Sequence, residues 1–274
     1  MESTTSKRLK EGRGGGRGSN YIPWLFIHDV PSKGRVSRIK GWKTGRVHHL
    51  LSDLERDYFF VCDWALPIVD IREQYPLLPL EETIAIAEEC GFRHPSVPNP
   101  TKRGTQIPVV MTTDFVLTIA KGLERFEQAR TVKYAQDLQS PRTLEKLEIE
   151  RRYWARRNVD WRIVTEKNFS RVLAHNVELI HAYVTIDDRL ALPAAMISQA
   201  VTLLTTEVTH KSAPLRHIAR ACDEKLGLEL GTCLTLAYHL LATRQWHVDM
   251  FTPLHTGNRL LLLNEDLAER VAYG

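Results

Sequence analysis

The chain has 274 residues, of which 43% are hydrophobic and 26% are charged, and its formal net charge is +4. These proportions are typical of a globular protein that buries a sizeable core in one large domain or two. No apolar run is long enough to span a bilayer, and the N-terminus lacks the apolar segment of a secretory signal. The four cysteines form no CxxC pair, so we expect reduced thiols in a cytoplasmic protein rather than a disulfide scaffold or a zinc site.

The positive charge is concentrated at the N-terminus. Residues 1–46 hold eleven lysines and arginines against three acidic residues, which is a net +8 and leaves −4 for the rest of the chain. This asymmetry favours a polyanionic partner, DNA or RNA first, over a basic tail kept for solubility. The glycines between Gly12 and Gly18 predict that residues 1–20 form a flexible basic arm, which either wraps phosphates or is only a leader. The candidate DNA-contacting residues are Lys7, Arg8, Lys10, Arg13, Arg17, Lys43 and Arg46.

Residues 21–166 are predicted to follow the order α-β-β-β-α-β. Apolar spacing predicts a helix over 47–61, and an apolar stretch predicts a strand over 68–75. Residues 76–107 contain several prolines and one short helical patch at 81–90, which indicates an insertion over the core. Strands are predicted over 108–119 and 129–135, followed by a helix that Pro141 opens and a short strand over 161–165.

The character of the chain changes to helical beyond residue 167. Helices are predicted over 215–225 and 228–244, followed by two short strands over 246–251 and 259–263. Two helices followed by a two-stranded ribbon indicate a winged-helix-like module. We therefore expect an α/β protein with a mostly helical, winged-helix-like C-terminal interaction domain over residues 167–274.

Three residues in the first domain are candidates for catalysis. Glu55 lies on the flank of the apolar stripe of its helix, whereas Asp53 falls on the solvent face. Taken alone, Glu55 is more simply interpreted as an ordinary boundary carboxylate. Asp114 is centred in an apolar strand, where its charge requires either a cation or an arginine partner. Lys133 projects from the next strand and can share a site with Asp114, although a solvated lysine at a strand edge is the plainer interpretation.

The three together have the layout of a restriction-endonuclease-like, PD-(D/E)xK site. Carboxylate oxygens hold a hard divalent cation such as Mg²⁺ or Mn²⁺, which polarises a phosphate and lowers the pKa of a bound water. A nearby lysine stabilises the attacking hydroxide or the charge that develops on the phosphate. The position two before the lysine is usually acidic and here is Thr131, so the Thr131 hydroxyl or the Val132 carbonyl is the expected replacement ligand.

Several longer strings make the chain similar to the TnsA family of transposon endonucleases. The similarity covers residues 8–166 and is carried by the runs Tyr21–Trp24, Lys43–Glu55, Asp70–Leu77, Thr112–Phe115 and Arg142–Trp154. It implies a restriction-endonuclease-like N-terminal domain and a smaller C-terminal domain. It also implies cleavage at the 5′ ends of a transposon beside a TnsB-type transposase, with contact to a TnsC-type ATP-dependent regulator.

The resemblance implies that the catalytic acid-acid-lysine set is Glu55, Asp114 and Lys133, and that a non-acidic residue is tolerated at Thr131. Glu73 and Glu150 are secondary candidates that either border the site or are salt-bridged carboxylates elsewhere. Two other functions stay open: a DNA-binding assembly factor with a vestigial site, and a stand-alone restriction or junction nuclease of the same fold. The intact acid-acid-lysine set favours catalysis, and the length of the resemblance favours the transposon-end nuclease.

Overall fold

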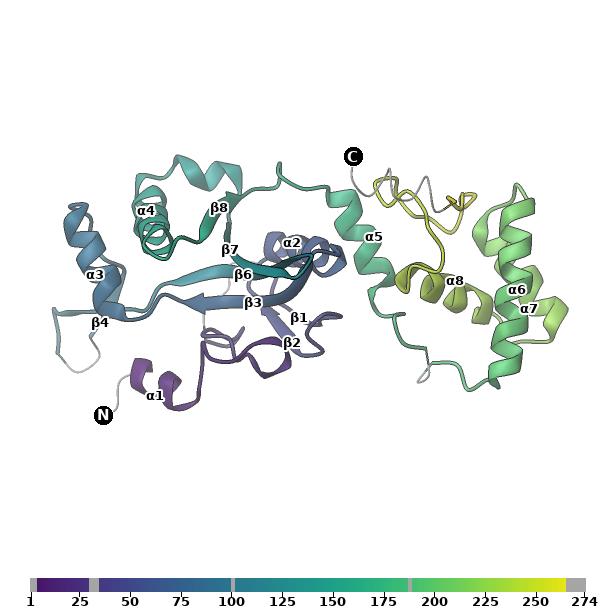
Figure 1. The fold of residues 1–274 in the computed structure, drawn as a ribbon, viewed down its shortest axis with the longest axis horizontal. Helices are drawn as coiled ribbons and strands as arrows, with labels where there is room; N and C mark the ends of the chain where they lie inside the picture. The colour runs from purple at the N-terminus through teal and green to yellow at the C-terminus, as the bar shows by residue number, and fades with distance from the viewer. Residues whose placement is uncertain (1–3, 30–34, 100–101, 187–188, 265–274) are drawn as a thin grey trace. The chain divides into compact units, whose positions relative to one another are not determined.

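The computed structural model describes residues 4–29, 35–99, 102–186 and 189–264 (Figure 1). The chain divides into two compact units, Met1–Phe169 and Ser170–Gly274. This division falls three residues after the domain boundary expected at residue 166. No helix in the described ranges has both the length and the apolar character needed to cross a bilayer.

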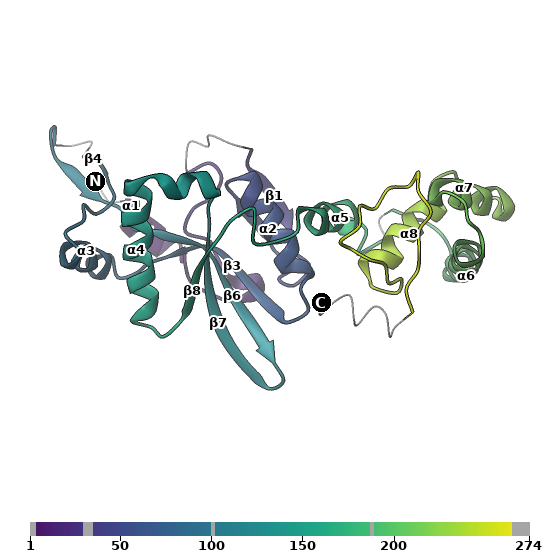
Figure 2. The same ribbon diagram turned by 90° about the horizontal axis from the view of Figure 1, so that it is seen from above.

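A four-stranded sheet with the order β3-β6-β7-β8 is the centre of the first unit. The first three strands are antiparallel, and β8 is parallel to β7. A parallel pair needs a crossover, which here is helix α4. Figure 2 shows α2 and α4 on opposite sides of this sheet. The bounds are β3 Ile68–Pro76, β6 Thr112–Lys121, β7 Glu124–Val132, β8 Asp160–Val164, α2 Asp53–Trp64 and α4 Pro141–Ala155.

The faces of the sheet are covered by different helices. On the α4 side, helix α3 (Leu80–Glu89) joins a buried cluster of Leu77, Ile86, Val116, Ala129, Ile149, Tyr153 and Trp154. On the α2 side, the rings of Tyr58 and Phe115 make an edge-on contact at 5.6 Å. The prolines after β3 lead into the predicted insertion, which consists of α3 and a small hairpin of β4 (Ser96–Pro98) and β5 (Gln106–Pro108). The expected α-β-β-β-α-β order is present as α2, β3, β6, β7, α4 and β8, with the insertion between β3 and β6.

The helix predicted over residues 47–61 begins later than the apolar spacing indicated. Val47–Leu50 is strand β2, which pairs with β1 (Ser37–Lys40), and the helix α2 begins at Asp53. The Ser52 hydroxyl accepts a hydrogen bond from the Glu55 N–H at 3.2 Å, while the Glu55 side chain reaches back to Ser52 and Leu51. This capping box determines where the helix starts, and the pairing with β1 overrides the helical spacing of the residues before it.

The N-terminal segment is folded onto the first unit and does not form the flexible arm that its glycines predicted. Helix α1 (Thr4–Lys10) and a short 3-10 turn (Gly18–Asn20) flank the glycines. The Gly14 N–H donates to the Ile22 carbonyl at 2.7 Å, and the Arg13 guanidinium binds Asp29 at 2.5 Å. Gly12, Gly14, Gly16 and Gly18 all have positive φ angles, so the glycines provide tight turns rather than disorder.

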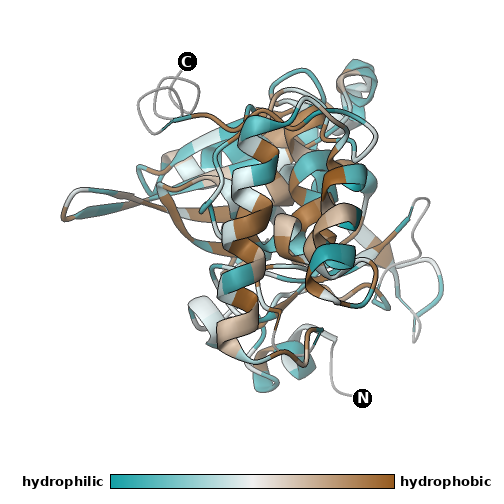
Figure 3. Ribbon diagram, turned by 90° about the vertical axis from the view of Figure 1, so that its right-hand side faces the viewer, coloured by the Kyte–Doolittle hydropathy of each residue, from teal (hydrophilic) through white to brown (hydrophobic). Residues whose placement is uncertain are grey.

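The second unit is helical, as expected, but its ribbon is reduced. Its helices are α5 Arg171–His181, α6 Ala194–His210, α7 Leu215–Leu226 and α8 Thr232–Ala242. Figure 3 shows that the helices of this unit carry both apolar and polar residues along their turns. Only one bridge, between His247 and Leu263, stands where two strands were predicted. Helix α8 also begins four residues late, because Asp223 accepts hydrogen bonds from the N–H groups of Gly231 and Cys233 and orders the turn before it.

The packing of the N-terminal segment predicts the effect of one substitution. A Cβ on Gly14 would lie 2.3 Å from Cγ of Pro76 at a φ of +79°. Gly14→Ala should therefore lower the free energy of unfolding by about 2–4 kcal/mol, measured by urea denaturation, because backbone strain and overpacking add. Gly45→Ala is the control, since Gly45 also has positive φ but nothing lies within 4 Å of its Cβ position. Equal losses in the two variants would contradict the packing against Pro76.

Candidate active site

Asp114 lies where the sheet opens. The pairing of β6 with β7 begins at Phe115 and Arg130, one residue after Asp114. The Asp114 carboxylate takes over the role of a backbone partner, because one of its oxygens accepts from the Val132 N–H at 2.7 Å and from Lys133 Nζ at 2.9 Å. The residue is only 7% exposed, so these two charge-assisted bonds compensate much of the desolvation of its carboxylate.

Lys133 follows the last residue of β7 rather than lying inside a longer strand. Its N–H still donates to the Val164 carbonyl of β8 at 3.0 Å, which fixes the backbone at this point. Burial lowers the pKa of Lys133, but the Asp114 carboxylate more than compensates, and the net pKa is raised. About a third of its side chain is exposed, and the raised pKa keeps its ammonium positively charged.

Glu55 lies in the first turn of α2 and faces the same region. Its carboxylate accepts from the Leu51 N–H and the Ser52 hydroxyl, both at 3.0 Å, and from the Gln74 amide at 3.3 Å. Burial is the largest cause of a raised pKa of about 7, and repulsion by Asp114 is the next. The structure thus brings Glu55, Asp114 and Lys133 together at one end of the sheet.

Glu150 is a third carboxylate at this end, contributed by α4. Its side chain is buried, and one oxygen accepts from the Thr113 hydroxyl at 2.5 Å and from the Thr131 hydroxyl. Burial and then repulsion by Asp114 raise the pKa of Glu150 to about 7. Sequence reasoning placed Glu150 only among the secondary candidates, since nothing local shows that the inward face of α4 points at Asp114.

Thr131 and Val132, the two expected replacement ligands, differ in how their oxygens are engaged. The Thr131 hydroxyl donates to Glu150 and accepts from the Trp161 indole at 3.1 Å, so it is committed between the sheet and α4. The Val132 carbonyl accepts from Lys133 Nζ at 2.8 Å and lies beside the Asp114 carboxylate. Val132 is therefore the better placed of the two candidate replacement ligands.

Glu73 belongs to a separate buried network. It is fully buried and accepts hydrogen bonds from the Arg46 guanidinium, the His48 ring and the His49 N–H. Burial by itself would raise the pKa of Glu73, but His48 and Arg46 have a larger opposite effect and lower the pKa to about 2. The salt-bridged interpretation of Glu73 describes this arrangement, and the network ties β2 to β3 beneath α2.

The basic candidates divide into internal and exposed cations. Arg46 and Arg13 have side chains only 8% and 10% exposed and bind carboxylates of the unit itself. Arg8 is 16% exposed and lies 5.6 Å from the centre of the Trp24 ring. Lys7 and Arg17 expose 72% and 64% of their side chains, whereas Lys10 and Lys43 have further partners within the unit.

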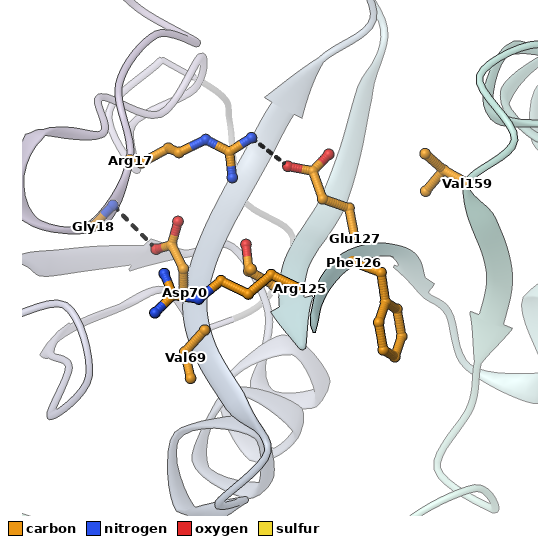
Figure 4. Close-up of a pocket in the computed structure, with 9 residues that line it drawn as sticks. Arg17, Gly18, Val69, Asp70, Arg125, Phe126, Glu127 and Val159 are labelled. Atoms are coloured by element: carbon orange, nitrogen blue, oxygen red, sulfur yellow. Dashed lines mark hydrogen bonds and ion pairs between the residues drawn. The ribbon is translucent and has the colours of Figure 1, made fainter. Parts of the chain in front are cut away.

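Arg17 lines a pocket of about 740 Å³ that is distinct from the carboxylate cluster (Figure 4). It binds Glu127 at 2.7 Å, while the Gly18 N–H donates to Asp70 at 3.2 Å. Neither Asp114 nor Glu55 nor Lys133 lines this pocket. The Glu127 carboxylate also binds Arg72. Glu127 would therefore keep an arginine partner if Arg17 moved away.

The cluster around Asp114 fits a hard cation that is shared with a substrate. Burial first and repulsion by the Asp114 carboxylate second raise the pKa values of Glu55 and Glu150 to about 7. A bound cation would reduce this repulsion. Within the described ranges no three His, Cys, Asp or Glu residues converge as a self-sufficient metal cage. The donor set that is present, carboxylate oxygens and the Val132 carbonyl, is of the kind that Mg²⁺ accepts, since it typically takes one or two carboxylates and completes its shell with water and substrate phosphate.

The raised pKa of Glu150 predicts a pH-dependent effect on stability. Its folded-state pKa of about 7 exceeds the ordinary value of 4.5 for a glutamate, so between these values the folded protein holds a proton that the unfolded chain releases, and stability falls as the pH rises through this range. Glu150→Gln keeps an acceptor for both threonines and removes the charge. It should raise the free energy of unfolding by roughly 2 kcal/mol at pH 8 and have little effect at pH 5, measured by denaturation in EDTA. A difference of the same size at both pH values would contradict the assignment.

Known proteins match this chain over most of its length. A family model described as "TnsA-like endonuclease N terminal" matches residues 67–166, which include Asp114, Lys133 and Glu150. A second, "TnsA endonuclease C terminal", matches residues 169–250. The chain is also 41% identical over 235 residues to the transposon Tn7 transposition protein TnsA of Escherichia coli, covering 85% of this chain and 81% of that protein. The chain therefore belongs to the TnsA endonuclease family, whose members act on DNA in transposition.

Proposed function

We propose that this endonuclease hydrolyses a phosphodiester bond at the 5′ ends of a transposon in a reaction that depends on Mg²⁺ or Mn²⁺. The observation that carries the proposal is the convergence of Asp114, Lys133 and Glu55 at the open end of the sheet. Glu55 lies before the first matched family segment, so its assignment rests on this geometry and on the resemblance.

The chain's own residues divide the chemistry among them. Asp114 and Glu55 would hold the cation, with the Val132 carbonyl as a further oxygen ligand. A bound divalent cation would polarise the phosphate and lower the pKa of a coordinated water. The Lys133 ammonium, now on Asp114, lies within reach of a phosphate bound at the cluster and would stabilise the negative charge that develops on it. Glu150 accepts hydrogen bonds from Thr113 on β6 and Thr131 on β7, and it would thereby orient the two strands next to Asp114.

The partners follow from the family and from the division of the chain. We propose that the enzyme acts on transposon-end DNA with a TnsB-like transposase that processes the other strand, and that a TnsC-like ATP-dependent regulator binds the second unit. All the catalytic candidates precede Ser170, the first residue of that unit. The second unit instead exposes large apolar side chains, Leu230, Phe251 and Leu261, which suit a protein contact. Action on chromosomal or plasmid DNA would take place in the bacterial cytoplasm.

Loss of the Asp114 carboxylate should abolish cleavage. Asp114→Ala should reduce 5′-strand nicking of transposon-end DNA by at least about 100-fold in the presence of the transposase, because it removes a metal ligand and the partner of Lys133. Asp53→Ala is the matched control, since Asp53 lies two residues before Glu55 with 42% of its side chain exposed and an ion pair to Arg56. Normal nicking by a folded Asp114→Ala protein would exclude this site.

Arg17 is the most testable of the proposed phosphate contacts. Arg17→Gln should weaken binding to duplex DNA and lower the slope of log affinity against log salt concentration by about 1, because one counterion-releasing contact is lost. Arg162→Gln is the control, since Arg162 is 72% exposed and also binds a carboxylate. Equal changes in both variants would indicate a general charge effect rather than a contact at Arg17.

A further inference from the structure

Gln74 has a backbone conformation that its surroundings must enforce. It lies in the middle of β3, is 2% exposed and has a φ of +48°. Residues other than glycine rarely adopt this left-handed region, and in proteins such strain gathers at functional sites. In the described part of the chain, the other non-glycine residues with positive φ are Asn158 and Arg244, and both lie in turns after helices.

The backbone turn at Gln74 interrupts the sheet opposite Asp114. The carbonyls of Ile71 and Glu73 accept from Arg46 and the Tyr21 hydroxyl, which lie outside the sheet. Because the carbonyls along a strand point alternately to its two sides, the Gln74 carbonyl would be expected to point toward β6. Instead, the Gln74 carbonyl accepts from the Trp24 N–H at 3.1 Å. The pairing passes from Glu73 and Phe115 to Tyr75 and Thr113, and the position of Asp114 is skipped.

The Gln74 side chain bridges the two elements that carry the catalytic carboxylates. Its amide nitrogen donates to Glu55 Oε2 at 3.3 Å, and its amide oxygen accepts from the Thr112 hydroxyl at 3.1 Å. Thr112 lies two residues before Asp114 on β6, whereas Glu55 lies on α2. A neutral amide can bind a carboxylate on one side and a hydroxyl on the other, which a glutamate at this position could not do without adding a further negative charge.

We propose that Gln74 is a positioning residue that holds Glu55 against the Asp114 strand in the geometry needed for a shared divalent cation. This role rests on the proposed function of Glu55 and Asp114 as metal ligands. The strained backbone leaves Asp114 free of a β3 partner, so that its carboxylate reaches Val132 and Lys133, and the amide keeps Glu55 from turning wholly toward its own helix cap.

The test separates this role from a merely structural one. Gln74→Gly accepts the positive φ, so the variant should melt at or above the wild-type temperature while losing the amide bridge. Gln74→Met keeps the length of the side chain and adds no charge, but it can neither donate to Glu55 nor accept from Thr112. Both should bind Mn²⁺ about 10–100-fold more weakly than the wild type, measured on the full-length protein without DNA by electron paramagnetic resonance of free Mn²⁺. Gln106→Met, at an exposed position on β5, is the control and should bind as the wild type does.

The outcomes distinguish the proposed role of Gln74 from the proposed metal site at Glu55 and Asp114. Wild-type Mn²⁺ affinity in Gln74→Gly would overturn the role of Gln74 alone, and a parallel fall in melting temperature and affinity would reduce Gln74 to a structural residue. Mn²⁺ binding by Asp114→Ala equal to the wild type would overturn the metal site itself, and the Gln74 proposal with it. Weaker binding in both Gln74 variants, with an unchanged or raised melting temperature in Gln74→Gly, is the expected result.

Discussion

The Asp114 carboxylate, bound to the Val132 N–H and the Lys133 ammonium, is the contact on which the candidate site depends. A backbone N–H that would otherwise continue the ladder between β6 and β7 is satisfied by a side chain, so the strands can separate without leaving a buried donor unpaired. Lys133, the first residue after β7, keeps about a third of its side chain exposed at this end of the sheet. The same carboxylate repels Glu55 and Glu150 and thereby sets the charge balance of the cluster.

That charge balance connects stability with function. The buried carboxyl groups of Glu55 and Glu150, both with pKa values near 7, cannot all ionise beside Asp114 without destabilising the metal-free fold. In the proposed mechanism, a divalent cation bound between these groups would offset this repulsion. The capping box at Ser52 and the amide of Gln74 hold Glu55 in place.

The basic N-terminal segment has two separate roles in the structure. Arg13 and Arg46 are internal cations that neutralise Asp29 and Glu73, and their loss would remove the closest arginine partner of each carboxylate. Lys7 and Arg17 instead keep most of their side chains in solvent, where a phosphate can reach them. A count of charges along the chain treats all of these residues alike, because it contains no information on burial.

The sequence by itself determined the order along the chain of the elements around the sheet and the helix that Pro141 opens, and it named Glu55, Asp114 and Lys133 as the catalytic candidates, since periodicity and local strings act over a few residues. Only the tertiary structure decided that Val47–Leu50 is a strand, that the N-terminal glycines form turns, and that the predicted ribbon reduces to one bridge. It also decided the surroundings of Glu150, whose partners Thr113 and Thr131 come from two other strands, and of Gln74, which is bound by Trp24, Glu55 and Thr112. The physical reason is that burial, hydrogen-bond partners and like-charge repulsion arise between residues far apart in the chain, and these contacts exist only once the sheet has assembled.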